Sequence, residues 1–445
     1  MNGAALQPSP YNAAVDLVSR NLVTPERSQK TAIVDDRGRY TYAELAERVD
    51  RAANALRGLG LVAEQRVALA LLDGIDFAAC FLGAIKAGIV PIPLNTLFQP
   101  PDFAYILADS RAKALVVSHE LEATLAEAAR LADWTGRAIV SGDARFFAPG
   151  TFSLERELER ADSTASAATT CADDVCFWLY SSGSTGRPKG TLHVQSSMIQ
   201  TADLFARDVL GLRESDVVYS AAKLFFAYGL GNALSFPMAV GATSVLYAQR
   251  PTPQAVAGIL REQAPTVFCG VPTLYNSLLA YDDFPKPAEL ALRLCTSAGE
   301  ALPEEVARAW TARTGVEVVD GIGSTEMLHI FVSNRPGDVR FGTTGVPVPG
   351  YRVRIVDDAG ADVPRGELGE LLVAGPTSAV QYWNNREKTR SAFVGEWTRT
   401  GDKFIEREDG AFVHCGRVDD MLKVGGIWVS PMEVEGALIA HPAVL

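Results

Sequence analysis

Hydroxyl groups, glycines and cations are concentrated between residues 180 and 190, which read Tyr180-Ser-Ser-Gly-Ser-Thr-Gly-Arg-Pro-Lys-Gly190. The glycines permit a close approach of the backbone to a ligand, and the hydroxyls can donate hydrogen bonds to it. Arg187 and Lys189 add positive charge, so the segment has the groups that triphosphate binding requires. It is not a Walker loop, because Pro188 precedes the lysine and Gly190 follows it. A flexible Ser/Gly connector is the alternative, but a connector would not need the Pro-Lys-Gly sequence directly after it.

Three further motifs follow in the chain: Gly321-Ile-Gly-Ser-Thr-Glu326, Thr400-Gly-Asp402 and Gly416-Arg-Val-Asp-Asp-Met-Leu-Lys-Val-Gly-Gly426. Together with residues 180–190 they resemble, in family order, the motifs of the adenylate-forming superfamily, which includes acyl-CoA synthetases, peptide-synthetase adenylation domains and luciferases. The resemblance spans essentially the whole chain. It implies a reaction in two steps. A substrate carboxylate attacks the α-phosphorus of ATP and expels pyrophosphate, and a thiol, that of coenzyme A, then displaces AMP from the acyl-adenylate.

The resemblance also implies a role for each motif residue. Asp402 would accept hydrogen bonds from the ribose hydroxyls with help from Arg417, although a surface salt bridge is the alternative for this pair. Thr325 would hold the α-phosphate, and Glu326 would hold Mg²⁺, a hard cation that prefers carboxylate oxygen. The residues expected to bind the nucleotide are Ser181, Ser182, Gly183, Ser184, Thr185, Gly186, Lys189, Gly299, Glu300, Ala301, Asp320, Gly321, Ile322, Thr325, Asp402 and Arg417. Those expected to act in catalysis are Lys423, Thr185 and Glu326, with Glu326 as the metal ligand.

The last motif lies at an expected hinge. Asp419 would be the hinge of a small mobile domain, and Gly425 and Gly426 would line a tunnel for coenzyme A, unless they are turn residues only. A capping box at Ser430-Pro-Met-Glu433 predicts one more helix. The adenylation lysine of the family would lie further on, in a C-terminal domain of which we expect most to be missing. We therefore expect the chain ending at Leu445 to release pyrophosphate much more slowly than a longer form.

Residues 224–229 read Leu-Phe-Phe-Ala-Tyr-Gly and match the segment from which this superfamily builds its acyl site. The segment has no carboxylate to pair with a substrate ammonium, so an α-amino acid would bury an unpaired charge. Tyr228, His329 and Ile330 suggest instead a short, flat site for one aromatic ring, with core packing as the alternative for Tyr228 and His329. The closest resemblance is to benzoate–CoA ligases, with 2-aminobenzoate or a hydroxybenzoate as alternative substrates. The residues expected to contact the aryl acid are Phe226, Ala227, Tyr228, Gly229, Ala298, Gly323, His329 and Ile330.

The amino-acid composition argues against some classes of protein. A net charge of −12 argues against a nucleic-acid surface, which would carry surplus lysine and arginine. The six cysteines are scattered without a Cys-x-x-Cys pair, which favours buried, reduced thiols. No apolar run reaches the ~18 residues of a membrane span, and the N-terminus has no secretory signal, so we expect a cytoplasmic protein, either a monomer or a homodimer. A phosphotransferase and a non-catalytic nucleotide-binding module remain the rival hypotheses from other classes.

The predicted site residues must be positioned by the fold, and the sequence alternates between strand-like and helix-like stretches. Apolar runs such as 66–72 and 113–118 are separated by helical stretches, which is typical of an α/β fold with a parallel sheet covered on both faces. Thr41-x-x-Glu44 is a capping box that predicts a helix ending near Gly58. After residue 341 the pattern alternates with period two, as in 351–356, which predicts a small antiparallel, barrel-like subdomain. We expect an N-terminal domain at 1–418, made of α/β subdomains 1–174 and 175–340 and a β-rich subdomain 341–418, and then the hinge and start of a small α+β C-terminal domain at 419–445.

Overall fold

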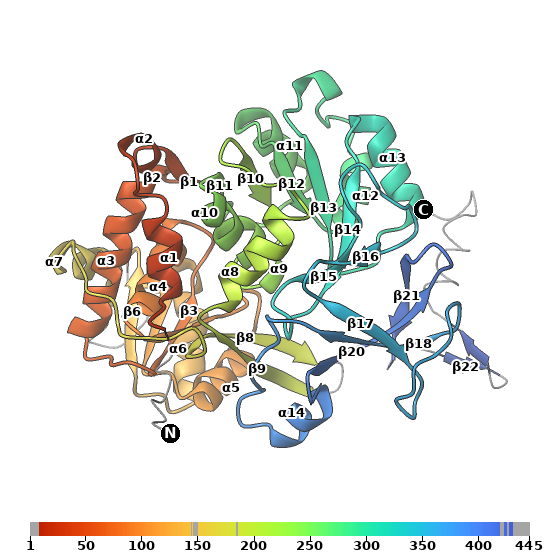
Figure 1. Ribbon diagram of the computed structural model, residues 1–445. Coiled ribbons are helices and arrows are strands. Elements are labelled where there is room, and N and C mark those ends of the chain that lie inside the picture. Colours follow the sequence, from red (N-terminus) through yellow and green to blue (C-terminus); the bar gives the residue numbers. More distant parts are fainter. Residues whose placement is uncertain are drawn as a thin grey trace, which may run out of the picture. The chain divides into compact units, whose positions relative to one another are not determined.

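The computed structural model describes residues 9–143, 145, 150–183, 186–418, 422–424 and 427–429. The chain forms two compact units, and their helices and strands are labelled in Figure 1. Unit 1 comprises Met1–Asp203, Leu212–Pro251 and Ala379–Arg386, and unit 2 comprises Leu204–Gly211, Thr252–Ser378 and Glu387–Leu445. The boundaries expected at residues 174, 340 and 418 stay predictions, as does the helix expected after Ser430, which lies outside the described residues.

A five-stranded parallel sheet forms one layer of unit 1, in the order β4-β3-β5-β6-β7. Its strands are β3 (Arg66–Ala70), β4 (Val90–Pro93), β5 (Ala114–Ser118), β6 (Arg137–Ser141) and β7 (Phe152–Ser153). The helices that alternate with them along the chain are α3 (Tyr42–Gly58), α4 (Ile75–Lys86), α5 (Pro100–Ser110), α6 (Glu122–Leu131) and α7 (Leu154–Arg160). Every residue of β5 is buried, as expected for a central strand of a parallel sheet. The predicted α/β fold is confirmed.

Helix α3 begins where the capping box predicts. The Thr41 hydroxyl accepts a hydrogen bond from the Glu44 backbone N–H at 3.2 Å, and the Glu44 carboxylate accepts one from the Thr41 backbone N–H at 2.7 Å. These two bonds satisfy amide groups that the first turn of a helix leaves without a partner. The helix then runs to Gly58, so both predicted ends are confirmed.

A second set of strands in unit 1 has the order β10-β11-β1-β2. These are β1 (Thr31–Asp35), β2 (Gly38–Thr41), β10 (Val217–Ser220) and β11 (Thr243–Val245). A two-stranded antiparallel hairpin of β8 (Val175–Gly183) and β9 (Gly186–Val194) is separate from both sheets. The other helical segments of the unit include α1 (Ala13–Ser19), α2 (Pro25–Ser28), the 3-10 turn η1 (His119–Leu121), α8 (Ser197–Thr201), α9 (Ala227–Leu230), the π-helical turn η3 (Gly231–Ser235) and α10 (Phe236–Val240).

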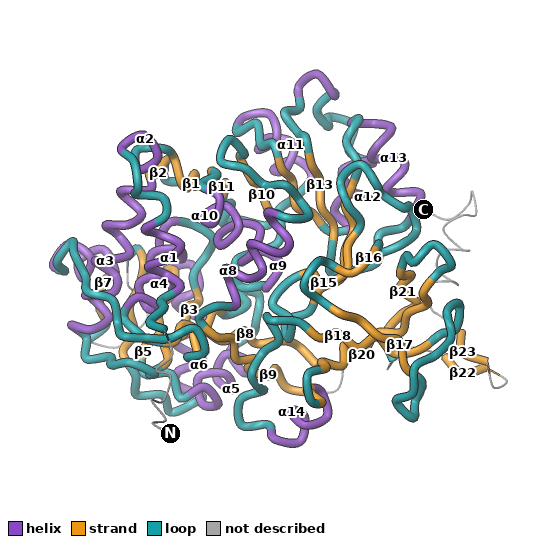
Figure 2. The backbone as a smooth tube through the Cα atoms, in the orientation of Figure 1, coloured by secondary structure: helices purple, strands orange, loops and turns teal. Residues whose placement is uncertain are grey.

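Unit 2 contains a strand group in the order β16-β15-β14-β13-β12 and a curled antiparallel sheet of five strands (Figure 2). The first group consists of β12 (Val267–Gly270), β13 (Leu294–Ser297), β14 (Val318–Gly323), β15 (Ile330–Ser333) and β16 (Val346–Pro347), with helices α11 (Pro253–Glu262), α12 (Pro272–Leu279) and α13 (Glu304–Thr314). The second consists of β17 (Arg352–Val356), β18 (Gly369–Ala374), β19 (Phe393–Val394), β20 (Trp397–Glu406) and β21 (Phe412–Arg417), and α14 (Arg386–Ala392) precedes β19. The antiparallel pairing of β17 with β18 confirms the predicted change of pattern after residue 341.

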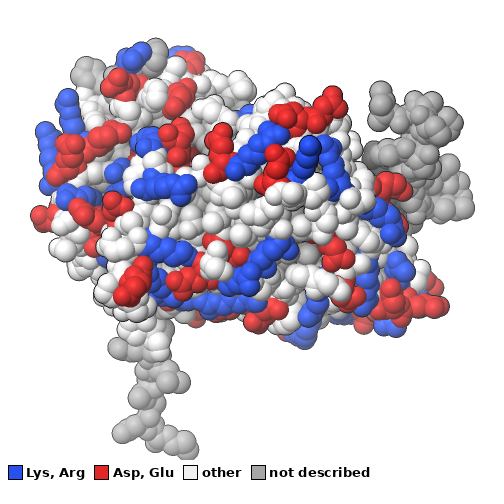
Figure 3. Space-filling model, turned by 90° about the horizontal axis from the view of Figure 1, so that it is seen from above, with Lys and Arg blue, Asp and Glu red and all other residues white. Residues whose placement is uncertain are grey.

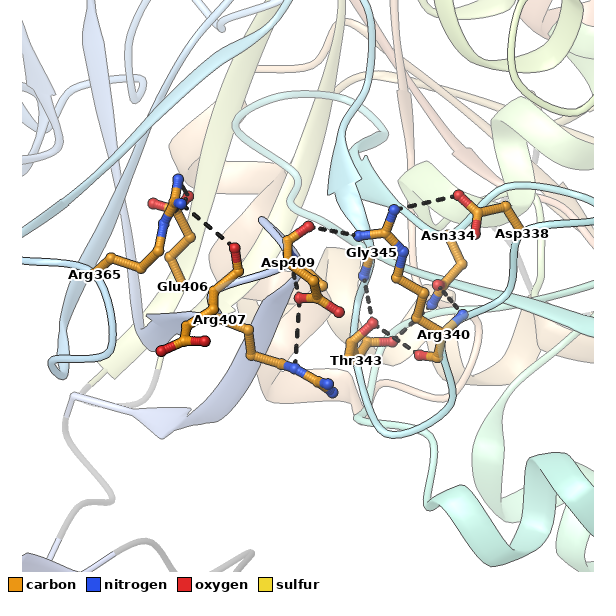
Figure 4. A network of polar contacts seen from close by, with 11 residues as sticks. Asn334, Asp338, Arg340, Thr343, Gly345, Arg365, Glu406, Arg407 and Asp409 are labelled. Carbon is orange, nitrogen blue, oxygen red and sulfur yellow. Dashed lines mark hydrogen bonds and ion pairs between the residues drawn. The ribbon is translucent and has the colours of Figure 1, made fainter.

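Polar contacts connect the two strand groups inside unit 2 (Figure 4). The Asn334 side-chain amide donates to the Thr343 carbonyl at 2.7 Å and so closes the loop between β15 and β16. From this loop the Arg340 guanidinium donates to the Asp409 carbonyl, in the turn between β20 and β21, at 2.9 Å. The Phe412 backbone N–H donates to the Gly345 carbonyl at 2.8 Å. The sheet that carries Asp402 is therefore fixed relative to the strands that carry Asp320 and Gly321.

All six cysteines are free thiols, and five of them are buried, as the sequence predicts. On the face drawn in Figure 3, lysine and arginine side chains are interspersed with aspartate and glutamate. None of the helices in the described parts of the chain has the length and hydropathy needed to cross a membrane.

Candidate active site

The phosphate-binding segment predicted as a loop is largely a β-hairpin. Tyr180 pairs with Gly190, Ser181 with Lys189 and Gly183 with Gly186, and the register shifts between Ser181 and Gly183. The serines and glycines do not prevent this pairing, because the ladder uses only backbone N–H and C=O groups. Ser184 and Thr185 lie outside the described residues.

A distant part of the chain holds the hairpin from the side of β9. The Trp383 backbone N–H donates to the Gly190 carbonyl at 2.8 Å, and its indole N–H donates to the Asp109 carbonyl at 2.9 Å. The Trp383 ring lies 4.6 Å from that of Trp178, between ring centroids. A side chain at position 190 would meet Tyr180 at 3.2 Å and Trp383 at 3.4 Å, which explains the glycine there. Sequence reasoning missed this support, since no motif marks residues 379–386.

Tyr180 anchors the other strand of the hairpin. Its hydroxyl donates to the Asp109 carboxylate at 2.6 Å. Burial, together with this hydrogen bond to an acid, raises the pKa of Tyr180 well above its ordinary value. The phenol therefore stays protonated and keeps its donor role at any ordinary pH.

Two groups on the hairpin are free to meet an anion. The Ser181 hydroxyl is buried and has no hydrogen-bond partner among the described residues. The Lys189 ammonium lies 4.6 Å from the centroid of the Tyr382 ring, and no carboxylate of the described residues pairs with it. Both groups have hydrogen-bonding capacity that the protein does not use, which is what a phosphate site requires.

Residues 224–229, which we call the aryl-acid segment, form a tight turn that leads into helix α9. The Phe226 backbone N–H donates to the Lys223 carbonyl at 3.0 Å, and the helix begins at Ala227. A Cβ atom on Gly229 would lie 2.0 Å from the Lys223 carbonyl oxygen, so only glycine fits. Phe226 is 48% exposed, while Tyr228 is only partly exposed. The segment thus presents aromatic side chains and no carboxylate, as the sequence predicts.

Within unit 2, the turn after strand β13 contains a further group of predicted residues. Ala298 is buried, and Gly299 has a φ of 94°, a backbone conformation that favours glycine. Glu300 is exposed and Ala301 is partly exposed. The backbone here changes direction sharply at the end of a parallel strand, a common place for ligand contacts.

Two glycines of strand β14 allow strand β15 to pack closely against it. Gly321 pairs with Ser333, and Gly323 pairs with Ile330. A Cβ atom at position 321 would lie 2.9 Å from the Ile330 side chain, and one at position 323 would lie 2.6 Å from the His329 carbonyl oxygen. The motif Gly-Ile-Gly is therefore required by packing as well as by any ligand.

The turn between β14 and β15 carries the predicted phosphate and metal residues. Thr325 and Glu326 are both partly exposed in this turn, which ends at Leu328 with a φ of 66°. His329 and Ile330 follow and are buried. The His329 ring lies 5.5 Å from that of Phe205, so core packing accounts for part of its surroundings.

Asp320 precedes this motif and is buried with spare hydrogen-bonding capacity. Its Oδ1 atom has no hydrogen-bond partner among the described residues. Burial raises the pKa of Asp320 well above its ordinary value, although the nearby Ser297 hydroxyl and the Gly321 backbone N–H act in the opposite direction. A buried carboxylate oxygen without a partner is a candidate ligand contact.

Asp402 and Arg417 lie opposite each other in the pairing of β20 with β21. The Asp402 Oδ1 atom is 3.5 Å from the Arg417 guanidinium and 3.3 Å from His414 Nε2. Asp402 is only 6% exposed, whereas the Arg417 side chain is 50% exposed, so their ion pair lies at the edge of the sheet. The two residues are brought together as expected, and their role toward a ribose stays a prediction. His414 was missed, because a single histidine in a β-strand gives no motif.

The remaining predicted residues belong to the last part of the chain. Lys423 lies in strand β22 (Leu422–Val424), which pairs with β23 (Ile427–Val429). The expected hinge Asp419 and the expected tunnel glycines Gly425 and Gly426 lie outside the described residues.

Comparison with known proteins gives a consistent result. A family model described as "AMP-binding enzyme" matches residues 23–383. The chain is 58% identical to a benzoate–CoA ligase of Thauera aromatica, with 98% of this chain and 82% of that protein covered. It is 50% identical to a 4-hydroxybenzoate–CoA/benzoate–CoA ligase of Rhodopseudomonas palustris, with 98% and 80% covered. The crystal structure of a benzoate CoA ligase from Burkholderia xenovorans LB400 superimposes with a TM-score of 0.90 at 49% identity and covers 97% of this chain and 84% of that one.

Proposed function

Because the chain belongs to the AMP-binding enzyme family, we propose that it uses ATP to activate benzoate, or a close aryl carboxylate, and transfers the acyl group to coenzyme A. The observation that carries the proposal is the aryl-acid segment, which presents aromatic and apolar groups without a carboxylate, in a chain 58% identical to a benzoate–CoA ligase. A substrate ammonium would find no counter-charge there, whereas a benzene ring would find aromatic partners.

In the nucleotide site, Asp402 accepts hydrogen bonds from the ribose hydroxyls. Arg417 and His414 hold its carboxylate from one side, which leaves lone pairs for a ligand. The Ser181 hydroxyl and the Lys189 ammonium contact the phosphates. The other residues of the proposed nucleotide site are Ser182, Gly183, Ser184, Thr185, Gly186, Gly299, Glu300, Ala301, Asp320, Gly321, Ile322 and Thr325.

Glu326 would hold Mg²⁺. The residue is partly exposed in a turn, and a carboxylate oxygen suits this hard cation. When bound there, Mg²⁺ would neutralise part of the negative charge that develops on the phosphates.

In the first step the carboxylate oxygen of the acid attacks the α-phosphorus, and the bond to pyrophosphate breaks. In the second step the sulfur of coenzyme A attacks the acyl carbonyl, and AMP leaves. Thr185 and Glu326 act in the first step by stabilising the charge of its transition state, while Lys189 holds the phosphates. Asp419 is the proposed hinge between the two steps, Lys423 faces the site in one orientation, and Gly425 and Gly426 line the path of coenzyme A.

The aryl acid is bound by Tyr228 and its neighbours. The proposed set is Phe226, Ala227, Tyr228, Gly229, Ala298, Gly323, His329 and Ile330. The R. palustris relative is named for two acids, so hydroxybenzoate is the second candidate substrate, with 2-aminobenzoate as another.

The test is carboxylate-dependent ATP–pyrophosphate exchange with the whole protein, across a panel of aryl acids, an α-amino acid and a fatty acid. We expect exchange with benzoate to exceed that with the amino acid and the fatty acid, and the substituted benzoates then rank the candidate substrates. Formation of ADP would support a phosphotransferase instead. ATP binding without exchange for any acid would support a non-catalytic module.

A further inference from the structure

Lys223 lies directly before the aryl-acid segment and connects it, through hydrogen bonds, to residues that follow strand β11. Its ammonium donates to the Tyr247 carbonyl and, at 2.7 Å, to the Gln249 carbonyl, both of which follow strand β11. It also lies 5.5 Å from the centroid of the Tyr247 ring. All these groups belong to unit 1. The Lys223 ammonium thus fixes the start of the aryl-acid segment to the part of the chain that follows strand β11.

Asp73 forms a hydrogen bond with Leu224, the residue that follows Lys223 in the chain. Its carboxylate accepts a hydrogen bond from the Leu224 backbone N–H at 3.2 Å. Asp73 follows strand β3 and is only 5% exposed. The turn beyond Leu224 has no spare room, because Gly229 packs directly on the Lys223 carbonyl. A shift at Lys223 or Leu224 would therefore move the residues that follow, including Tyr228.

The two charges depend on each other. Burial lowers the pKa of Lys223, and Asp73 counteracts that effect. Burial raises the pKa of Asp73 to about 6, and Lys223 and the Leu224 N–H counteract that rise. Tyr219 of β10 is a further titratable group near Asp73, and it also lies near Tyr247. Burial raises the pKa of Tyr219. If one charge of a buried pair is removed, the other charge is left uncompensated.

We propose that Asp73 and Lys223 are positioning residues that hold the aryl-acid segment in its binding conformation, so that protonation of Asp73 weakens binding of the aryl acid but not of ATP. The inference rests on the proposed function. Neither residue needs to touch the acid, since they act through Leu224 and the turn to Gly229.

The first test uses the unmodified protein. We measure the Kd for benzoate and the Kd for ATP by titration calorimetry from about pH 8 to about pH 5, where Asp73 gains its proton. The Kd for benzoate should rise about fivefold or more over this range, while the Kd for ATP changes less than about twofold. A Kd for benzoate that does not change with pH would overturn the inference. If the protein bound no aryl acid at any pH, the proposed function would fail instead.

The second test uses variants. Asp73→Asn keeps the shape and an acceptor for Leu224 but stays neutral, so its Kd for benzoate should already be raised at pH 8 and should show no step in acid. Lys223→Met should weaken benzoate binding further, and Asp73→Asn/Lys223→Met should recover part of that loss, because no charge is left uncompensated. Asp162→Asn and Lys113→Met, which are exposed residues of the same unit, serve as matched controls.

Two results would contradict a positioning role. One is an equal rise in the Kd values for benzoate and ATP in Asp73→Asn, which would mean general damage to the unit. The other is strict additivity of the two substitutions, which would mean that the charges are independent. If Lys223→Met fails to fold, the pH profiles of the unmodified protein and of Asp73→Asn still decide the question.

Discussion

Tyr228 is the residue at which the proposed aryl-acid site can be separated from the nucleotide site. Tyr228→Ala removes a partly exposed ring from the aryl-acid segment, and it should raise the KM for benzoate about tenfold or more, since a well-placed ring pair contributes about 1 kcal/mol beyond burial. The KM for ATP should change less than about twofold. Steady-state rates with each substrate varied in turn measure both values. Tyr228→Phe keeps the ring and is the matched control; equal effects on the two KM values would place Tyr228 outside the site.

His414 is a residue that the structure adds to the motif residues Asp402 and Arg417. Its Nε2 atom lies 3.3 Å from the Asp402 carboxylate, which is also held by Arg417. His414→Phe removes this contact and should raise the Kd for ATP about tenfold, because a hydrogen bond to a charged group is worth about 1.5–3 kcal/mol. Benzoate binding should be unaffected. Titration calorimetry with ATP measures the change, His414→Gln should retain part of the affinity, and an unchanged Kd in His414→Phe would contradict the role.

At the scale of elements, the hairpin β8–β9 depends on residues that are far away in the sequence. Trp383→Ala deletes the ring that packs on Trp178 and the indole N–H that binds the Asp109 carbonyl. We expect a loss of about 3–4 kcal/mol in the free energy of unfolding and a lower Tm. ATP affinity should fall as well, because the strands that carry Ser181 and Lys189 lose their support. Val380→Thr, at a position 50% exposed in the same segment, should change neither quantity. Denaturant unfolding and ATP titration provide the measurements.

Elements defined by local patterns were predictable, and those defined by distant partners were not. The capping box at Thr41 and Glu44 fixes the start of α3 through contacts three residues apart, so the sequence shows it directly. The alternation at 351–356 likewise identifies β17. In contrast, residues 181–190 have the composition of a loop. Residues 181–183 nevertheless pair with residues 186–189 in a hairpin, which a segment nearly two hundred positions later supports. Only the fold brings that segment to β9.

At the scale of the whole molecule, motif recognition proposed residues for the nucleotide and aryl-acid sites but none of the residues that hold them in place. Asp402 and Arg417 form an ion pair, as their expected cooperation requires, while His414, Asp73 and Lys223 were not considered. The missed residues have no motif of their own, and their role arises from burial beside a motif residue. Unit 1 itself is assembled from three separate stretches of the chain, so no single boundary in the sequence could describe it.

Buried carboxylates should give the whole molecule a characteristic dependence of stability on pH. The pKa of Asp73 rises from an ordinary 3.8 to about 6 on folding, so the folded state binds its proton more tightly than the unfolded state. The contribution of Asp73 to stability is therefore fully present below about 3.8 and is lost as the pH rises through about 6. Relative to Asp73→Asn, the unmodified protein should lose about 3 kcal/mol in its free energy of unfolding across this window, at ~1.4 kcal/mol per pKa unit.

Denaturant unfolding of both proteins at several pH values across the window measures this difference. Asp320 in unit 2 has a raised pKa of the same sign, but it is present in both proteins and cancels in the comparison. A difference that stays constant with pH would mean that Asp73 has an ordinary pKa in the folded state. The expected result has a consequence for function, since Asp73 contributes most to stability at a pH where it is protonated, whereas it supports the aryl-acid segment when it is charged. Stability is sacrificed at neutral pH to keep a buried charge beside Lys223, as is common where a fold prepares a binding site.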